Sequence, residues 1–204
     1  MNKNVSYYLQ RIAFILFSLL VAGCGTSPTP NFFHLEKNAD VTLTGIERGT
    51  AIGVGPVTIA QYLDRPQIVT RAGSHRLLMS EFNRWSEPLK NSISRVISVS
   101  LSTQLQTTRV YLIPRRNKSI PLDYQIAIDI ARFDGELGSD ARLVARWSLY
   151  DTDNKVILTK VSIISVASEG TDFESLVAAE NRALQRLSTE IAEAIKFEKN
   201  RVPM

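Results

Sequence analysis

The chain has 204 residues, of which 44% are hydrophobic and 22% are charged, and its formal net charge is +4. This composition is typical of a globular protein and excludes a disordered or collagen-like chain. It also argues against a nucleic-acid-binding protein, because a basic binding face needs a larger surplus of cations. No apolar run reaches the ~20 residues that a membrane-spanning helix requires.

The first 23 residues have the layout of a secretory signal peptide. Lys3 and Arg11 are their only charged residues, and the apolar segment IAFILFSLLVA follows at 12–22. The small residues Ala22 and Gly23 then precede Cys24, the only cysteine of the chain. A positive start, a short apolar segment and a small-residue cleavage zone are the three parts of such a leader. We therefore expect residues 1–23 to be removed on export.

The four residues VAGC, at 21–24, resemble a bacterial lipobox. This resemblance implies that Cys24 carries a covalent lipid and begins the mature chain. A plain signal peptide with an incidental cysteine and a short signal anchor are the alternatives, but a lone thiol in an exported protein has no partner within its chain. Gly25 is not the aspartate that retains many lipoproteins at the inner membrane, which favours the outer membrane. Small and polar residues at 24–31 then predict a flexible tether.

The rest of the chain predicts one α+β domain over 32–197, followed by a tail at 198–204. The expected sheet is mostly antiparallel, with two amphipathic helices packed on one face. Alternating or continuous apolar patterns predict strands, and apolar residues at helical spacing predict the helices. The strands are expected at 32–35, 51–60, 67–71, 75–80, 109–113, 124–133, 142–150 and 155–167, and the helices at 86–106 and from 171 to about 197.

Local signals refine these elements. The Gly55–Pro56 step predicts a bulge or an edge position in its strand, and the turn residues at 72–74 predict a hairpin. Ser86 is the candidate N-cap of the first helix. Thr171 and Glu174 fit a capping box at the start of the second.

The sequence offers no catalytic or metal-binding pattern. Its two histidines, His34 and His75, lie far apart, and neither belongs to a metal-ligand spacing. The acids Asp123, Asp129 and Asp134 lie near one strand, where we expect solvated surface carboxylates. The chain is therefore not expected to be an enzyme, to hold a metal or to use a cofactor other than the covalent lipid on Cys24.

Two stretches are unusual and suggest a protein interface. They are YLDRPQIVTR, at 62–71, and FNRWSEPL, at 82–89. Tryptophan, tyrosine and arginine are enriched where proteins bind each other, so the candidate interface residues are Tyr62, Asp64, Arg65, Arg84 and Trp85. The alternative is that Trp85 is a core anchor and Arg84 an ordinary surface residue. In that case the interface would lie on the exposed sheet face around Arg142 and Arg146.

With IARFDG at 130–135, these stretches and the lipobox resemble the ABC-type transport auxiliary lipoprotein family, whose best-known type is the paraquat-inducible protein C lipoprotein. The resemblance implies a noncatalytic outer-membrane lipoprotein facing the periplasm. It implies an MCE-domain protein of a lipid transport system as partner, and a homo-oligomeric ring. A structural or assembly lipoprotein of another envelope machine, and a periplasmic carrier that itself binds lipid, are the competing functions.

Overall fold

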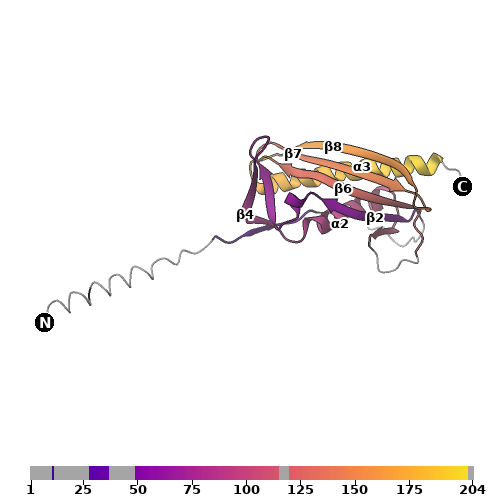
Figure 1. Cartoon of the computed structure of the whole chain (residues 1–204), viewed down its shortest axis with the longest axis horizontal. Helices are drawn as coiled ribbons and strands as arrows, with labels where there is room; N and C mark the ends of the chain where they lie inside the picture. The colour runs from indigo at the N-terminus through magenta and orange to yellow at the C-terminus, as the bar shows by residue number, and fades with distance from the viewer. Residues whose placement is uncertain (1–10, 12–27, 37–48, 115–119, 202–204) are drawn as a thin grey trace.

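The computed structural model describes residue 11 and residues 28–36, 49–114 and 120–201. The predicted leader cleavage site, Cys24 and Gly25 lie outside the described residues. Figure 1 shows the order of the elements along the chain. They are β1 (Asn31–Phe33), β2 (Ile52–Ile59), the short 3-10 helix η1 (Gln61–Leu63), β3 (Gln67–Arg71), β4 (Leu77–Trp85), α2 (Leu89–Gln104), β5 (Val110–Leu112), β6 (Tyr124–Gly135), β7 (Asp140–Tyr150), β8 (Val156–Ala167) and α3 (Phe173–Arg201).

The fold is α+β, as predicted, and it is built on one eight-stranded sheet. The three long strands β6, β7 and β8 form the expected antiparallel meander. β2 lies parallel to β6 and to β5, and β1 lies parallel to β4, so the whole sheet is mixed. The parallel pair β2 and β5 needs a crossover connection, and the chain between these strands contains α2.

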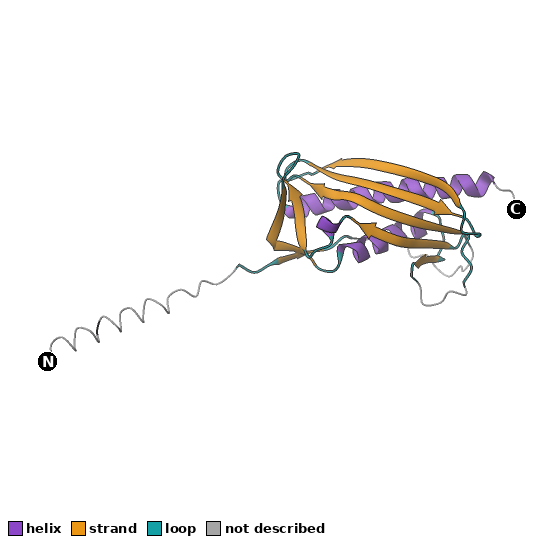
Figure 2. Ribbon diagram, in the orientation of Figure 1, coloured by secondary structure: helices purple, strands orange, loops and turns teal. Residues whose placement is uncertain are grey.

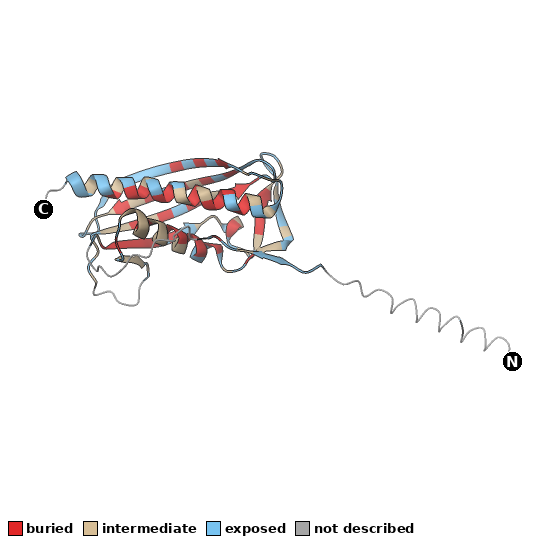
Figure 3. Ribbon diagram, turned by 180° about the vertical axis from the view of Figure 1, so that it is seen from behind, coloured by how far each residue is buried: buried red, intermediate tan, exposed pale blue. Residues whose placement is uncertain are grey.

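Both helices lie on the same face of the sheet (Figure 2). Viewed from behind, α3 turns its buried residues toward the sheet and its exposed residues toward solvent (Figure 3). The predicted apolar stripe of each helix is buried or partly buried against the strands. On β7 the alternate residues from Leu143 to Leu149 are fully buried, which is the pattern of a strand with one face on the core.

The helix ends differ from the sequence-based expectation. The N-cap of α2 is Pro88, not Ser86, and no side chain caps it; the backbone N–H of Ser86 instead donates to the carbonyl of Phe33. At α3, Oδ1 of Asp172 accepts the backbone N–H of Ser175 at 2.7 Å, so Asp172 occupies the position expected for Thr171. α3 also continues to Arg201, past the predicted start of the tail.

The predicted hairpin of β3 and β4 is present, but β4 extends to Trp85 rather than ending at residue 80. The extension exists because β1 pairs with it in parallel register, with Phe32 opposite Arg84 and Phe33 opposite Trp85. The Gly55–Pro56 step is a bulge between β2 and β6, not a sheet edge. No helix within the described ranges combines the length and the hydropathy of a membrane span.

Candidate interaction surface

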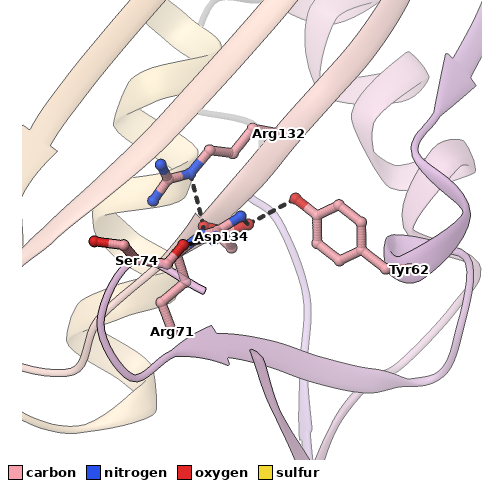
Figure 4. A network of polar contacts seen from close by, with 5 residues as sticks. All are labelled: Tyr62, Arg71, Ser74, Arg132 and Asp134. Carbon is pink, nitrogen blue, oxygen red and sulfur yellow. Dashed lines mark hydrogen bonds and ion pairs between the residues drawn. The ribbon is translucent and has the colours of Figure 1, made fainter. Parts of the chain in front are cut away.

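A buried carboxylate joins the two unusual stretches to the meander. Asp134, near the end of β6, is fully buried and accepts four hydrogen bonds (Figure 4). The Tyr62 hydroxyl donates to Oδ2 at 2.6 Å, and Nε of Arg132 donates to Oδ1 at 2.8 Å. Arg71 donates through Nε to Oδ1 at 2.7 Å and through Nη2 to Oδ2 at 3.2 Å. Asp134 thereby holds η1 and β3 against β6.

The burial of Asp134 corrects the expectation that it is a solvated surface carboxylate. It lies on the sheet face opposite the helices, because its neighbours Phe133 and Gly135 pack toward the core and toward α3. Tyr62, Arg71 and Arg132 surround its carboxylate and supply the donors that a buried charge needs. The sequence carried one signal of this arrangement, since donors and acceptor all come from the stretches 62–71 and 130–135.

The network changes the ionisation of its members. Burial and the hydrogen bond to Asp134 raise the pKa of Tyr62 to about 12, so the phenol stays a donor at physiological pH. The hydrogen bond to Asp134 likewise raises the pKa of Arg71. Two cations therefore face one anion, which leaves the cluster with a net positive charge.

A second buried acid lies on α3. Glu180 is 1% exposed, and neither of its carboxylate oxygens has a hydrogen-bond partner among the described residues. Desolvation raises the pKa of Glu180 well above its usual value, and the negative charge of Asp134 adds to the shift. Burial therefore favours the protonated, neutral form of Glu180, the form in which burial is least unfavourable.

Three of the five predicted interface residues, Asp64, Arg65 and Trp85, line one surface cavity of ≈ 350 Å³. The cavity lies where η1 and β3 meet the start of α2. Its other lining residues are Pro66, Ser86, Glu87, Pro88 and Leu89.

The side chains at this cavity are held in different ways. Trp85 is buried, so it is a core anchor that also forms a wall. Arg65 is half-buried: its Nη1 donates to the sulfur of Met79 at 2.6 Å, while its Nε is buried and has no hydrogen-bond partner among the described residues. Asp64 is exposed. The cavity thus combines an apolar wall, an exposed anion and an unused donor, which are kinds of group that take part in contacts between proteins.

The other two predicted residues point elsewhere. Tyr62 belongs to the Asp134 network. Nε of Arg84 donates to the carbonyl of Glu81 at 2.8 Å, and its Nη2 lies 3.5 Å from a carboxylate oxygen of the same residue. The structure therefore divides the predicted set into three cavity residues, one residue of the network and one residue on the neighbouring strand.

An ion pair that the sequence reasoning missed supports the rim of the cavity. Glu87 pairs with Arg95 of α2 and accepts the hydroxyl of Ser92 at 2.7 Å. The hydrogen bonds from Arg95 and Ser92 lower the pKa of Glu87 to about 2. The available signal was the spacing of eight residues between Glu87, just before α2, and Arg95 within it, and such a spacing is too common to single out a pair.

The described residues contain no group of three or more histidine, cysteine, aspartate or glutamate side chains that could hold a metal ion. His34 lies 3.7 Å from Glu36 in an exposed pair near the first strand. His75 lies in the exposed turn between β3 and β4.

The fold recurs in solved structures of low sequence identity. A crystal structure of an uncharacterised protein matches with a TM-score of 0.68 at 15% identity, covering 82% of this chain and 99% of that one. A protein from Xanthomonas campestris matches with a TM-score of 0.66 at 19% identity, covering 84% of this chain and 98% of that one. At these identities the likeness shows the fold alone. No curated protein sequence matches the chain.

The sequence itself matches a family model over residues 33–192, from β1 through most of α3. The matched range includes the Asp134 network and the cavity at Trp85, so the features described above lie inside the family domain. The chain belongs to the family described as the ABC-type transport auxiliary lipoprotein component.

Proposed function

We propose that this protein is a noncatalytic, lipid-anchored accessory subunit of an ABC-type lipid transport system, and that it binds an MCE-domain protein in the periplasm. The observation that carries the proposal is the family match over 33–192, which spans nearly the whole domain. We expect an auxiliary component of a transporter to act by binding the transporter rather than by catalysing a reaction.

The anchor is the lipid on Cys24, and the absence of aspartate at position 25 directs the protein to the outer membrane. Two or three acyl chains hold a protein at a bilayer almost irreversibly, because each buried CH₂ contributes about 0.8 kcal/mol. The tether at 24–31 then places the domain close to the membrane surface. These features support a component that stays at one membrane while its partner reaches it from the other.

The binding surface is the cavity lined by Asp64, Arg65 and Trp85, which we call the Trp85 cavity. The Asp134 network fixes its position, because Tyr62 and Arg71 lie on either side of Asp64 and Arg65 in the chain and both bond to Asp134. A surface held at both ends in this way needs little ordering when it binds, which favours affinity. We expect the same surface to contact either the MCE-domain protein or the next copy in a homo-oligomeric ring.

The test is capture of the full lipidated protein from solubilised envelopes, with bound proteins identified by mass spectrometry and the oligomer mass measured by light scattering. An MCE-domain protein captured with the wild-type chain is the expected result. The charge reversal Asp64→Lys should reduce that capture, whereas Asp153→Lys, an exposed aspartate in the turn after β7, should not. Capture of cell-wall or other envelope proteins without an MCE-domain protein would instead favour the structural or assembly role.

A further inference from the structure

A surface groove lies between β1 and the start of α3, apart from the Trp85 cavity. Its volume is ≈ 1310 Å³, larger than the ~300–1,000 Å³ of most small-molecule sites. Phe33 and Phe173 are in ring contact there, with their centroids 6.2 Å apart. Phe32, Leu137, Val177 and Ala178 extend this apolar part of the groove, and polar side chains line the rest.

Two large apolar side chains of the groove are exposed to solvent. Phe32 is 64% exposed and Leu137 is 37% exposed, and both residues line the groove. Asn181 lies at the inner end, 8% exposed, and its Oδ1 has no hydrogen-bond partner among the described residues. Neighbouring exposed apolar side chains rimmed by polar ones mark a surface that binds a ligand or a partner.

The groove lies where the chain enters the domain. Pro30 and Asn31, at the point where the tether enters the domain, belong to its lining. Only six residues separate Cys24 from Asn31, and the seven steps between the two span at most about 25 Å in full extension. Figure 1 shows that α3 begins at the same end of the molecule as β4, while its other end lies far from that entry point. If Cys24 carries the anchor, the groove is held next to a bilayer.

The charges on the rim are mixed. The cation is Arg182, which pairs with Glu169 at 3.2 Å. The anions are Glu36, Glu174 and Asp172, whose pKa is lowered by the backbone hydrogen bond from Ser175. A headgroup that carries both a phosphate and an ammonium group matches this rim better than a purely anionic one.

We propose that this groove binds an acyl chain of a zwitterionic phospholipid from the bilayer in which the protein is anchored. Phe32, Phe33 and Phe173 contact the chain, and the headgroup stays at the charged rim. The inference rests on the proposed function for the anchor. It deepens that function by giving the accessory protein a lipid-binding site of its own.

Photo-crosslinking tests the assignment directly. The full lipidated protein is reconstituted in vesicles of phosphatidylethanolamine and phosphatidylglycerol that contain phosphatidylethanolamine with a diazirine on one acyl chain. Crosslinked peptides are then mapped by mass spectrometry. We expect crosslinks within 30–36 and 171–182. Crosslinks confined to the tether, to the Trp85 cavity or to the open sheet face would overturn the proposal.

Two variants and a matched control make the test specific. Ala178→Trp fills the groove from an exposed position, and Phe32→Ser removes one wall; each should reduce the crosslink yield at least fivefold. Phe197→Ser is the control, because Phe197, 66% exposed, is nearly as exposed as Phe32, 64% exposed, but lies near the other end of α3. Melting curves verify that all three variants fold. Equal yields from Phe32→Ser and Phe197→Ser would overturn the proposal.

A second arm separates the groove from the anchor. The mature chain with Cys24→Ser is titrated with lysophosphatidylethanolamines of 12, 14 and 16 carbons. Each methylene that becomes fully buried strengthens binding about fourfold, so affinity should rise with chain length and fall in Ala178→Trp. No binding in this arm, with crosslinks only to the protein's own anchor lipid in the first, would overturn the assignment to bilayer lipid. A wild-type chain that fails to enter vesicles while Cys24→Ser still binds would contradict the anchor and leave the groove supported.

Discussion

Tyr62 donates its hydroxyl to the buried carboxylate of Asp134 at 2.6 Å, although 72 residues separate the two in the chain. One residue belongs to η1 and the other to β6, so this contact ties the segment that carries the Trp85 cavity to the meander. Arg71 and Arg132 complete the set of donors.

Asp134→Asn should lower the free energy of unfolding by about 3 kcal/mol, because it removes the buried anion that two arginines and a tyrosine share. The side chains of Arg71 and Arg132 are 21% and 27% exposed, so solvent still stabilises their charges in the variant. The expected loss of stability is therefore at the lower end of the range for a broken buried ion pair. Urea denaturation at pH 7 measures it. Asp129→Asn on the same strand is the control, since Asp129 is exposed, and it should change the free energy by less than about 0.5 kcal/mol.

Tyr62→Phe should lower the free energy of unfolding by about 1 kcal/mol at pH 8, where the phenol is a donor. In the folded protein the pKa of Tyr62 is raised from 10 to about 12, so its contribution is complete below pH 10 and is lost as the pH rises toward 12. The difference between wild type and Tyr62→Phe should therefore shrink between pH 10 and 12. Denaturation curves of both proteins between pH 10 and 12 test this prediction. The other tyrosines are present in both proteins, so their titration cancels in the difference. A constant difference would mean that the hydroxyl is not held as the structure has it.

Glu180→Gln should stabilise the protein at pH 8 by at least about 1 kcal/mol. The raised pKa of Glu180 favours the neutral acid in the folded state, so its contribution is greatest below its ordinary pKa of 4.5 and declines as the pH rises. Glutamine stays neutral at every pH and has almost the same shape. Melting temperatures of both proteins at pH 5 and pH 8 test the prediction. A variant that is less stable than wild type at pH 8 would indicate a charged, partnered Glu180.

Cys24→Ala should abolish acylation and release the protein from the membrane, because the thiol is the group that takes the lipid in a lipobox. Labelling with a radioactive fatty acid and fractionation of the envelope measure both effects. The wild-type protein should appear in the outer-membrane fraction, since Gly25 is not an aspartate. Labelling that persists in Cys24→Ala would contradict the lipoprotein assignment, and a wild-type protein found mainly at the inner membrane would contradict the sorting.

The sequence predicted the elements well wherever burial follows a local period. The stripes of α2 and α3 and the alternation in β7 follow from apolar residues at regular spacing. The hairpin of β3 and β4 followed from the turn residues between them. The bulge at Gly55–Pro56 followed from residues that disfavour a regular strand.

The misses share a different physical origin. Asp134 is buried by side chains more than 60 residues earlier in the chain, and no local pattern records which distant segment covers the end of a strand. β4 is longer than its own pattern suggests because β1 pairs with it. The cap of α3 moved by one residue because Asp172 and Thr171 are both good caps, and the folded backbone selects between them.

The interface was the least predictable feature, since aromatic and arginine residues serve cores as well as binding sites. Trp85 is buried in the core and also lines the Trp85 cavity.

The most direct test of the account is site-specific photo-crosslinking in intact envelopes. A photoreactive amino acid is placed at position 64, exposed beside the Trp85 cavity, or at position 153, exposed in the turn between β7 and β8. The account predicts crosslinks from position 64 to an MCE-domain protein or to a second copy of this chain, and none to either from position 153. Equal yields from both positions, or no crosslink from position 64 in membranes that contain the anchored protein, would contradict it.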